Sequence, residues 1–298
     1  ILTGGDVDFV AMGRSWLADP EWGTKALSGR CDDIRKCTGC MYCFETAGNT
    51  LCTGESHAFC SINPYMGQEL EYGEPKKDGA GRKAVVVGGG PAGMEAAMIL
   101  AQREFDVTLF EKGDQLGGQM YLASLPPKRG KMANFKRWAE KQLKDLGVDV
   151  RLNTAVTADE IRAMDPYAVF LCTGSAPILP RSIKGIDGDN VYTVPQILRE
   201  QVKLSGKKVV VAGAGLTGME TAEFLQEHGN EVTNIDMMPA VGFGAFQLLL
   251  MDEEALTAQS GVRPMPGHKL VEIRPDSVLI EDAAGYQIEH ALWLRRLY

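Results

Sequence analysis

Cysteines are the residues of this sequence whose type and spacing point most directly to chemistry. Five of the seven lie between Cys37 and Cys60, and Cys37, Cys40 and Cys43 follow the spacing C-x-x-C-x-x-C. Three thiolates at this spacing can converge on one centre from a single loop. With a fourth thiolate, such a set fits either a tetrahedral zinc ion or a [4Fe–4S] cluster.

The spacing favours an iron–sulfur cluster, with zinc or unrelated thiols as the alternatives. A structural zinc site more often uses two separated C-x-x-C pairs, whereas here three cysteines are close and the fourth is distant. We see no export signal, so we expect a cytoplasmic protein, in which clustered cysteines are metal ligands more often than disulfides. Cys52 and Cys60 compete for the fourth position, and Cys31 is a spare thiol.

The bulk properties are those of an ordinary globular protein. Its 298 residues are enough for roughly two domains. The net charge of −8 argues against a nucleic-acid or membrane-surface partner, because such binding usually needs a basic surface. No apolar run reaches about 18 residues, so we expect no transmembrane helix. The chain begins at Ile1 and ends in an irregular run, and we therefore expect a fragment of a longer protein.

A second set of residues with possible chemistry occurs in a sequence pattern that is present twice in the chain. The run KAVVVGGGPAGMEAA begins at Lys83, and KVVVAGAGLTGMETA begins at Lys208. Each copy predicts a buried strand, a G-x-G-x-x-G turn, an amphipathic helix and a second strand that ends in an acid, which is Glu111 in the first copy and Asp236 in the second. The glycines of the two turns are Gly88, Gly90, Gly93, Gly213, Gly215 and Gly218.

This order of residues is typical of dinucleotide binding. The first glycine permits a tight turn, the second lets the backbone approach a pyrophosphate, and the third lets helix and strand pack closely. The helix N-terminus offers free N–H groups to the phosphates, and the acid accepts hydrogen bonds from a ribose. Asp236 would repel a 2′-phosphate, and Met237 and Met238 supply no arginine to hold one. We therefore predict NADH rather than NADPH at the second turn.

Two such units in one chain resemble the flavoproteins that have two dinucleotide-binding domains. The resemblance implies FAD at the first turn and a nicotinamide nucleotide at the second. The run LGGQ follows Glu111 as it does in the FAD domains of this family, and LCTGSAP matches the family's turn between the two domains. The residues that it adds to the implied cofactor sites are Gly118, Gln119, Thr173 and Gly174.

The cysteine segment indicates a narrower family within these flavoproteins. The pattern C-x-x-C-x-x-C, a gap, C-x-x-N-P and the run GQELEYG resembles the iron–sulfur flavoenzymes of the old yellow enzyme class. That class includes 2,4-dienoyl-CoA reductase, trimethylamine dehydrogenase, enoate reductase and bile-acid-inducible NADH:flavin oxidoreductases. The resemblance implies a [4Fe–4S] cluster and makes Cys60, which precedes Asn63 and Pro64, the fourth ligand, with Cys52 as the fallback.

The N-terminus is similar to the same class. The run VDFVAMGRSWLADP resembles the last strand of its (β/α)8 barrel, with the strand at residues 7–12 and the following loop and helix. The resemblance implies that Gly13 and Arg14 contact the phosphate of FMN. We expect no catalytic set among the four histidines.

The expected fold is α/β, with the C-terminal end of a TIM barrel followed by two Rossmann-like dinucleotide-binding domains. We expect the truncated barrel in residues 1–30 and an iron–sulfur segment in 31–80. An incomplete FAD-binding domain would follow in 81–200 and a C-terminally truncated NAD-binding domain in 201–298.

The implied function is an NADH-dependent oxidoreductase in which electrons pass from NADH through FAD, the cluster and FMN to an activated C=C bond. The implied partner is a small molecule, namely an unsaturated acid or acyl-CoA, and homo-oligomerisation stays open. Two alternatives remain. One is a diaphorase-type electron-donor module like the small subunit of glutamate synthase, which lacks a barrel, and the other is a truncated, non-catalytic remnant.

Overall fold

The structure is a computed structural model that describes residues 4–54, 57–125 and 130–292. The described residues form two compact units, which meet in sequence between Ser175 and Ala176. Residues 176–200 therefore group with the second unit. Within the described ranges, no helix has both the length and the apolar composition needed to cross a membrane.

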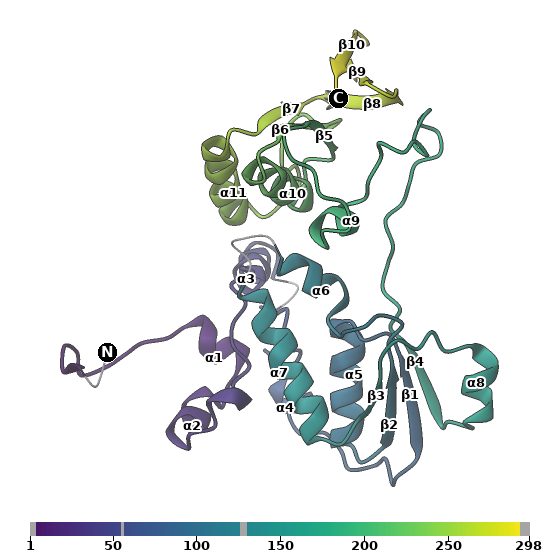
Figure 1. The fold of residues 1–298 in the computed structure, drawn as a ribbon. Coiled ribbons are helices and arrows are strands. Elements are labelled where there is room, and N and C mark those ends of the chain that lie inside the picture. Colours follow the sequence, from purple (N-terminus) through teal and green to yellow (C-terminus); the bar gives the residue numbers. More distant parts are fainter. Residues whose placement is uncertain (1–3, 55–56, 126–129, 293–298) are drawn as a thin grey trace. The chain divides into compact units, whose positions relative to one another are not determined.

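The first unit is built on a parallel four-stranded sheet with the order β3-β2-β1-β4 (Figure 1). The middle strand β1 is rich in valine, and its residues 84–86 are fully buried, as expected for a strand covered on both faces. The sheet confirms the predicted parallel α/β architecture. Its strands are β1 (Lys83–Val87), β2 (Asp106–Phe110), β3 (Asp149–Arg151) and β4 (Ala168–Leu171).

Helices connect these strands and form the main core of the unit. Helix α5 packs against β1 and β2, and α7 packs against α5. Helix α7 buries Phe135, Trp138, Ala139 and Leu143, whose spacing of three and four residues places them on one face. The helices after the first strand are α5 (Pro91–Gln102), α6 (Gly118–Ala123), α7 (Met132–Asp145) and α8 (Ala158–Ala163).

The cysteine segment precedes the sheet and consists of short elements joined by irregular chain. Ile62 and partly buried Cys37 and Cys60 pack against the core of the first unit, so the segment is part of that unit. Its elements are α1 (Arg14–Ala18), α2 (Trp22–Leu27), the 3-10 turn η2 (Cys31–Asp33), α3 (Tyr42–Thr53) and α4 (Glu69–Tyr72).

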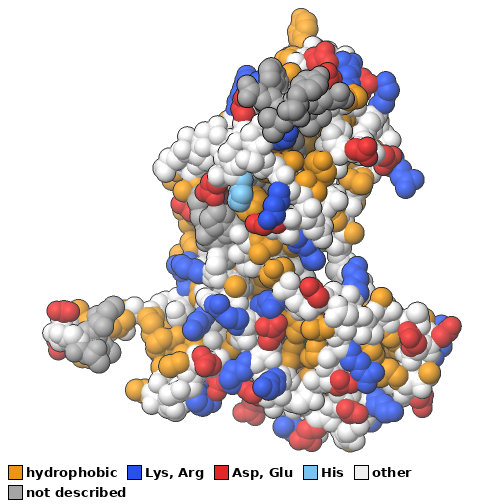
Figure 2. Space-filling model, in the orientation of Figure 1, with side chains coloured by type: hydrophobic (Ala, Val, Ile, Leu, Met, Phe, Trp, Pro, Cys, Tyr) orange, Lys and Arg blue, Asp and Glu red, His pale blue; other side chains and the backbone are white. Residues whose placement is uncertain are grey.

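The structure does not show the predicted barrel strand at residues 7–12, where the chain is irregular. Phe9 is 92% exposed, and Figure 2 shows hydrophobic side chains along this segment, to the left. A barrel strand is held by hydrogen bonds to both neighbouring strands, and none of the described residues offers them to this segment. The end of a TIM barrel is therefore not seen among the described residues.

The second unit has a parallel sheet with the order β5-β6-β7 and an antiparallel sheet with the order β10-β9-β8. Ile235 of β6 packs with Val278 and Ile280 of β9, and this contact joins the two sheets. The strands are β5 (Lys208–Ala212), β6 (Glu231–Asp236), β7 (Arg263–Pro266), β8 (His268–Ile273), β9 (Ser277–Asp282) and β10 (Gln287–Ala291). The helices are α9 (Val194–Leu198), α10 (Leu216–Glu227) and α11 (Gln247–Ser260).

Candidate functional site

The first glycine turn joins β1 to α5, and two of its glycines are required by the protein's own backbone. Gly88 has φ +109°, and a Cβ atom there would lie 2.2 Å from the backbone oxygen of Cys172. At Gly93 a Cβ atom would lie 1.8 Å from the oxygen of Gly88. The first glycine therefore makes the turn and the third lets α5 approach it, as the spacing predicts.

Gly90 has a different reason to be glycine. Its φ of −74° suits any residue, and a Cβ atom would have no described atom within 4 Å. It is the N-cap of α5, where no described side chain caps the helix, whereas Thr157 and Glu160 form a capping box on α8. The space and the uncapped N–H groups suit a phosphate group that approaches the backbone.

The acid that closes β2 is held by the glycine turn. Glu111 Oε2 accepts a hydrogen bond from the N–H of Gly89 at 2.7 Å, and Oε1 accepts one from Gly113 at 2.7 Å. An ionised carboxylate has about four lone-pair positions, so roughly two remain for ribose hydroxyls. The predicted carboxylate therefore lies beside the turn in a fixed orientation.

The other residues predicted for the FAD site surround the same turn. A Cβ atom on Gly118 would lie 3.1 Å from the Cα of Gly90, and one on Gly88 would lie 3.1 Å from the nitrogen of Thr173. Gln119 Nε2 donates a hydrogen bond to the oxygen of Ser175 at 3.2 Å, next to Gly174. The fold thus brings two pairs of residues, Gly118–Gln119 and Thr173–Gly174, to the first glycine turn, although the pairs are far apart in the sequence.

The second turn repeats this geometry between β5 and α10. Gly213 has φ +107°, and a Cβ atom on Gly218 would lie 1.8 Å from its oxygen. Gly215 is the N-cap of α10, where no described side chain caps the helix and a Cβ atom would have no described neighbour within 4 Å. The backbone again leaves room for a ligand at the second glycine.

Asp236 has the role in this copy that Glu111 has in the first. Its Oδ2 accepts a hydrogen bond from the N–H of Ala214 at 2.6 Å, and its Oδ1 accepts one from Met238 at 2.9 Å. The two acids therefore contact equivalent backbone groups of their turns. This shared arrangement indicates two nucleotide-binding turns of the same design.

Sequence reasoning missed one residue of the second turn. Asn234 in β6 is 1% exposed, and its Nδ2 donates hydrogen bonds to the oxygens of Val211 at 3.0 Å and Gly213 at 2.9 Å. These bonds satisfy the buried amide and fix the start of the turn. The available signal was a polar residue inside an otherwise buried strand, where the first copy has Leu109.

The four predicted thiol ligands are half-buried in the first unit. Burial and the charges of Cys40 and Cys37 raise the pKa of Cys43. Burial also raises the pKa of Cys60, with a smaller contribution from the same two cysteines. Cys43 and Cys60 thus each sense the charges of Cys37 and Cys40, whereas Cys52 is exposed on α3.

Two of these thiols have polar contacts at sulfur. The N–H of Gly39 donates to Cys37 Sγ at 3.4 Å, and Cys40 Sγ lies 2.9 Å from Ser61 Oγ. Hydrogen bonds to sulfur are among the features that tune iron–sulfur clusters. Within the described residues, however, no three such side chains converge closely enough to hold a metal ion.

Gly13 and Arg14 lie at the start of α1, next to the cysteine loop. Arg14 Nη1 donates to the sulfur of Met41 at 2.9 Å, and Met41 has a positive φ of 59°. A left-handed conformation is uncommon for a methionine, and it bends the chain between Cys40 and Cys43. The structure therefore places the residue predicted for FMN against the loop predicted for the cluster.

Comparison with known proteins gives a consistent result. The sequence model described as pyridine nucleotide-disulphide oxidoreductase matches residues 82–293. An NADH oxidase from Thermoanaerobacter brockii is 38% identical, over 96% of this chain and 44% of its own length. A cinnamate reductase from Clostridium sporogenes is 37% identical, over 79% of this chain and 34% of its own length.

The solved structure of a 2-naphthoyl-CoA reductase in complex with 2-naphthoyl-CoA matches with a TM-score of 0.90 and 33% identity. The match covers 97% of this chain and 43% of that protein. The chain thus spans less than half the length of these relatives.

Proposed function

The chain belongs to the pyridine nucleotide-disulphide oxidoreductase family, and from this premise we propose that it forms the nucleotide- and cluster-binding part of an NADH-dependent flavin and iron–sulfur oxidoreductase. When bound, the cofactors would carry electrons from NADH through FAD, a [4Fe–4S] cluster and FMN to an activated C=C bond. The observation that carries the proposal is the presence in one chain of two glycine turns with matching acids and a four-thiol loop.

The first unit would bind FAD. The uncapped N-terminus of α5 would face the pyrophosphate, and Gly90 would leave room for it. Glu111 would accept the ribose hydroxyls with the lone pairs that Gly89 and Gly113 leave free. The remaining residues proposed for this site are Gly88, Gly93, Gly118, Gln119, Thr173 and Gly174.

The second unit would bind NADH. Asp236 is held toward the turn by two backbone N–H groups, and there it would accept the diol of the adenosine ribose. A carboxylate at this place repels a 2′-phosphate, which is the physical reason for a preference over NADPH. The glycines proposed for this site are Gly213, Gly215 and Gly218.

The cysteine loop would hold the cluster through Cys37, Cys40, Cys43 and Cys60. Support comes from the four-thiol donor set and from the packing of Cys37 and Cys60 against the core of the first unit. Gly13 and Arg14 would contact the FMN phosphate, and support comes from their position beside the same loop. A loop between the two flavin sites would fit an electron relay.

The substrate class is proposed from the relatives. Their names include a cinnamate reductase and a 2-naphthoyl-CoA reductase, whose substrates are an unsaturated acid and an acyl-CoA. We therefore expect a small unsaturated acid or acyl-CoA for the whole protein. Other relatives are named as dehydrogenases of amines. The whole protein could therefore be tested for oxidation of a substrate as well as for reduction.

The proposal is tested by purifying the full-length protein without oxygen and counting iron, sulfide, FAD and FMN per chain. The expected result is about four irons, about four sulfides and one of each flavin. NADH should then bleach the flavin absorbance, and an enoate should restore it. Zinc without sulfide, or a protein without FMN, would overturn the proposed electron path.

A further inference from the structure

A largely buried arginine lies between the cysteine loop and α5. Arg35 Nη1 donates a hydrogen bond to the backbone oxygen of Ile62 at 2.7 Å, and its Nη2 lies 3.5 Å from Glu95 Oε1. Its guanidinium carbon also lies 4.2 Å from the centre of a ring of Trp138 on α7. The side chains of Arg35 and Glu95 are 13% and 16% exposed, so solvent screens this ion pair little.

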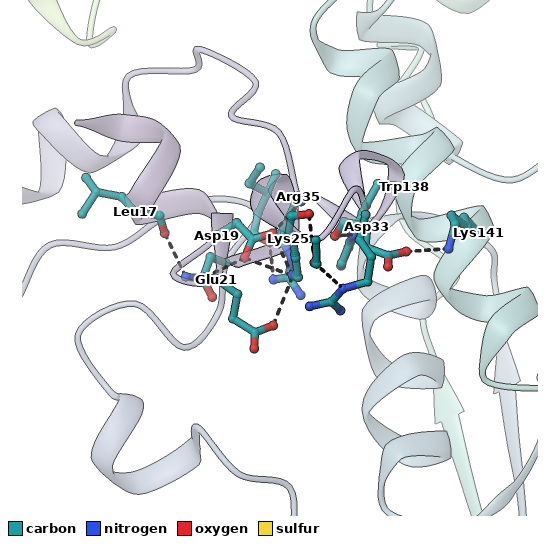
Figure 3. Close-up of polar contacts among 12 residues, drawn as sticks. Leu17, Asp19, Glu21, Lys25, Asp33, Arg35, Trp138 and Lys141 are labelled. Atoms are coloured by element: carbon teal, nitrogen blue, oxygen red, sulfur yellow. Dashed lines mark hydrogen bonds and ion pairs between the residues drawn. The ribbon is translucent and has the colours of Figure 1, made fainter. Parts of the chain in front are cut away.

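The surrounding chain fixes Arg35 in place (Figure 3). Its N–H donates to Asp19 Oδ2 at 2.8 Å, and Asp19 is 3% exposed and also binds Lys25 Nζ at 2.9 Å. Nearby, Asn63 Nδ2 donates to the oxygen of Leu17 at 2.8 Å. Because both its backbone and its side chain are held, Arg35 keeps its positive charge at one place.

Along the chain, Arg35 and its carbonyl partner each lie close to one of the proposed cluster ligands. Arg35 precedes Cys37 by two residues, and Ile62 follows Cys60 by two residues. The Ile62 oxygen belongs to the peptide group whose N–H is that of Asn63. The hydrogen bond of Arg35 to the Ile62 oxygen therefore holds the guanidinium against the backbone that follows Cys60. A cation on this carbonyl also polarises the peptide group that it belongs to.

We propose that Arg35 is a positioning residue that raises the reduction potential of the cluster, and that Glu95 moderates its charge. The inference rests on the proposed function, because it requires a cluster on the cysteine loop. A fixed positive charge favours the reduced state of a cluster, which is more negative by one electron than the oxidised state. Net charge and hydrogen bonds to sulfur are known determinants of such potentials.

Glu95 is the anion that opposes Arg35. Burial raises the pKa of its carboxyl, and the charge of Arg35 lowers it. Its Oε2 is buried, and so is the hydroxyl of Tyr65, and neither has a hydrogen-bond partner among the described residues. Burial and the charge of Glu95 raise the pKa of Tyr65. The neutral phenol therefore adds no charge next to Glu95 until the pH exceeds this raised pKa. In alkaline buffer below the tyrosine pKa, the Glu95 carboxylate therefore offsets part of the Arg35 charge.

The two charges make predictions of opposite sign. We would titrate the cluster of the full-length protein with a redox-mediator mixture and follow the EPR signal of its reduced state in alkaline buffer. Arg35→Gln should shift the potential downward, so that the reduced-to-oxidised ratio at fixed potential falls roughly tenfold, which is about 59 mV for one electron. Glu95→Gln should shift it upward, and Arg35→Lys should keep most of the native potential.

The matched control is Arg137→Gln. Arg137 is an exposed arginine on α7, directly before Trp138, so its removal changes the net charge equally in a solvent-screened place. This variant should leave the potential unchanged. If Arg35→Gln does not retain the cluster, the inference is tested by Glu95→Gln alone, whose reduction potential should be higher than that of the wild type.

The outcomes separate the inference from the proposed function. A wild-type protein that lacks iron and sulfide overturns both. A cluster whose potential is unchanged in the Arg35 and Glu95 variants, or shifts in the same direction in both, overturns the inference alone. A purely structural role of Arg35 would lower cluster content without giving opposite shifts.

Discussion

At the scale of single residues, the two acids show how a short spacing fixes a side chain. Glu111 and Asp236 each accept two hydrogen bonds from backbone N–H groups, at 2.6–2.9 Å. One partner of each acid follows it by two residues, and the other, Gly89 or Ala214, is close because the parallel strands end at the same edge of the sheet. The carboxylates are therefore pre-oriented, and a ribose would pay little entropy to meet them.

Replacing Asp236 should weaken NADH binding specifically. Asp236→Asn keeps the size of the side chain but removes the charge and turns one acceptor into a donor beside a backbone N–H. We expect the KM for NADH of the full-length protein to rise about tenfold, which corresponds to about 1.4 kcal/mol. Steady-state kinetics with NADH and NADPH measure this change.

The matched control for Asp236 is Glu111→Gln, which makes the equivalent change at the first turn. This variant should lower FAD content and leave the KM for NADH nearly unchanged in the molecules that retain FAD. A rise in the NADH KM of equal size in both variants would contradict the assignment of the two turns.

Two cysteines that compete in the sequence should behave differently in experiments. Cys60 is half-buried and coupled to Cys37 and Cys40, whereas Cys52 is exposed on α3. Cys60→Ser should therefore lose most of the iron and sulfide, and Cys52→Ser should retain them. Iron and sulfide analysis of both variants, purified without oxygen, measures the difference. Retention in Cys60→Ser with loss in Cys52→Ser would reverse the ligand assignment.

At the scale of elements, each glycine turn contains glycines that packing requires and one that it does not. In the first turn, Gly93 is needed for packing of α5 on its own turn, because a Cβ atom would lie 1.8 Å from a backbone oxygen. Gly90 has no such constraint from the described residues. One short motif thus contains one glycine that the fold requires and another that the described backbone leaves unconstrained.

Alanine at these two glycines should separate stability from binding. Gly93→Ala should destabilise the first unit by about 2 kcal/mol or more, because the clash involves backbone that cannot move freely. Gly90→Ala should leave urea unfolding of the FAD-free protein nearly unchanged and lower FAD affinity at least tenfold. Urea titration and flavin fluorescence measure the two effects. A Gly90→Ala variant that binds FAD normally would show that the open space is not used by the pyrophosphate.

At the scale of the whole molecule, each compact unit has its own sheet, core and glycine turn. The two ligands should therefore stabilise different parts of the chain. A ligand at a hundred times its dissociation constant stabilises the folded state that binds it by about 2.7 kcal/mol. The cost of local opening should rise only where the ligand is bound.

Hydrogen exchange measured by mass spectrometry should reveal this division. FAD should slow exchange in β1, β2 and α5 by roughly a hundredfold, and NADH should slow it in β5, β6 and α10 by a similar factor. Asp236→Asn should reduce the NADH effect and leave the FAD effect unchanged. Protection of the same unit by both nucleotides would contradict the proposed division of sites.

The sequence by itself determined the features that depend on residues close in the chain. Strand, turn, helix and acid lie within one short stretch in each copy, so their spacing was sufficient to predict two parallel α/β units and the positions of Glu111 and Asp236. The same local pattern supported the family resemblance, which the comparisons confirm. The strand predicted at residues 7–12 is not shown, and a barrel strand requires neighbours that the described residues do not supply.

The tertiary structure decided the contacts between distant residues. Only packing showed that Gly118 lies against Gly90, that Cys37 and Cys60 both pack against the core of the first unit, and that Arg35 reaches both Ile62 and Glu95. It also showed why Asn234 interrupts an apolar strand. The physical reason is that such contacts depend on how helices, loops and sheet close around one core, and no spacing along the chain specifies that closure.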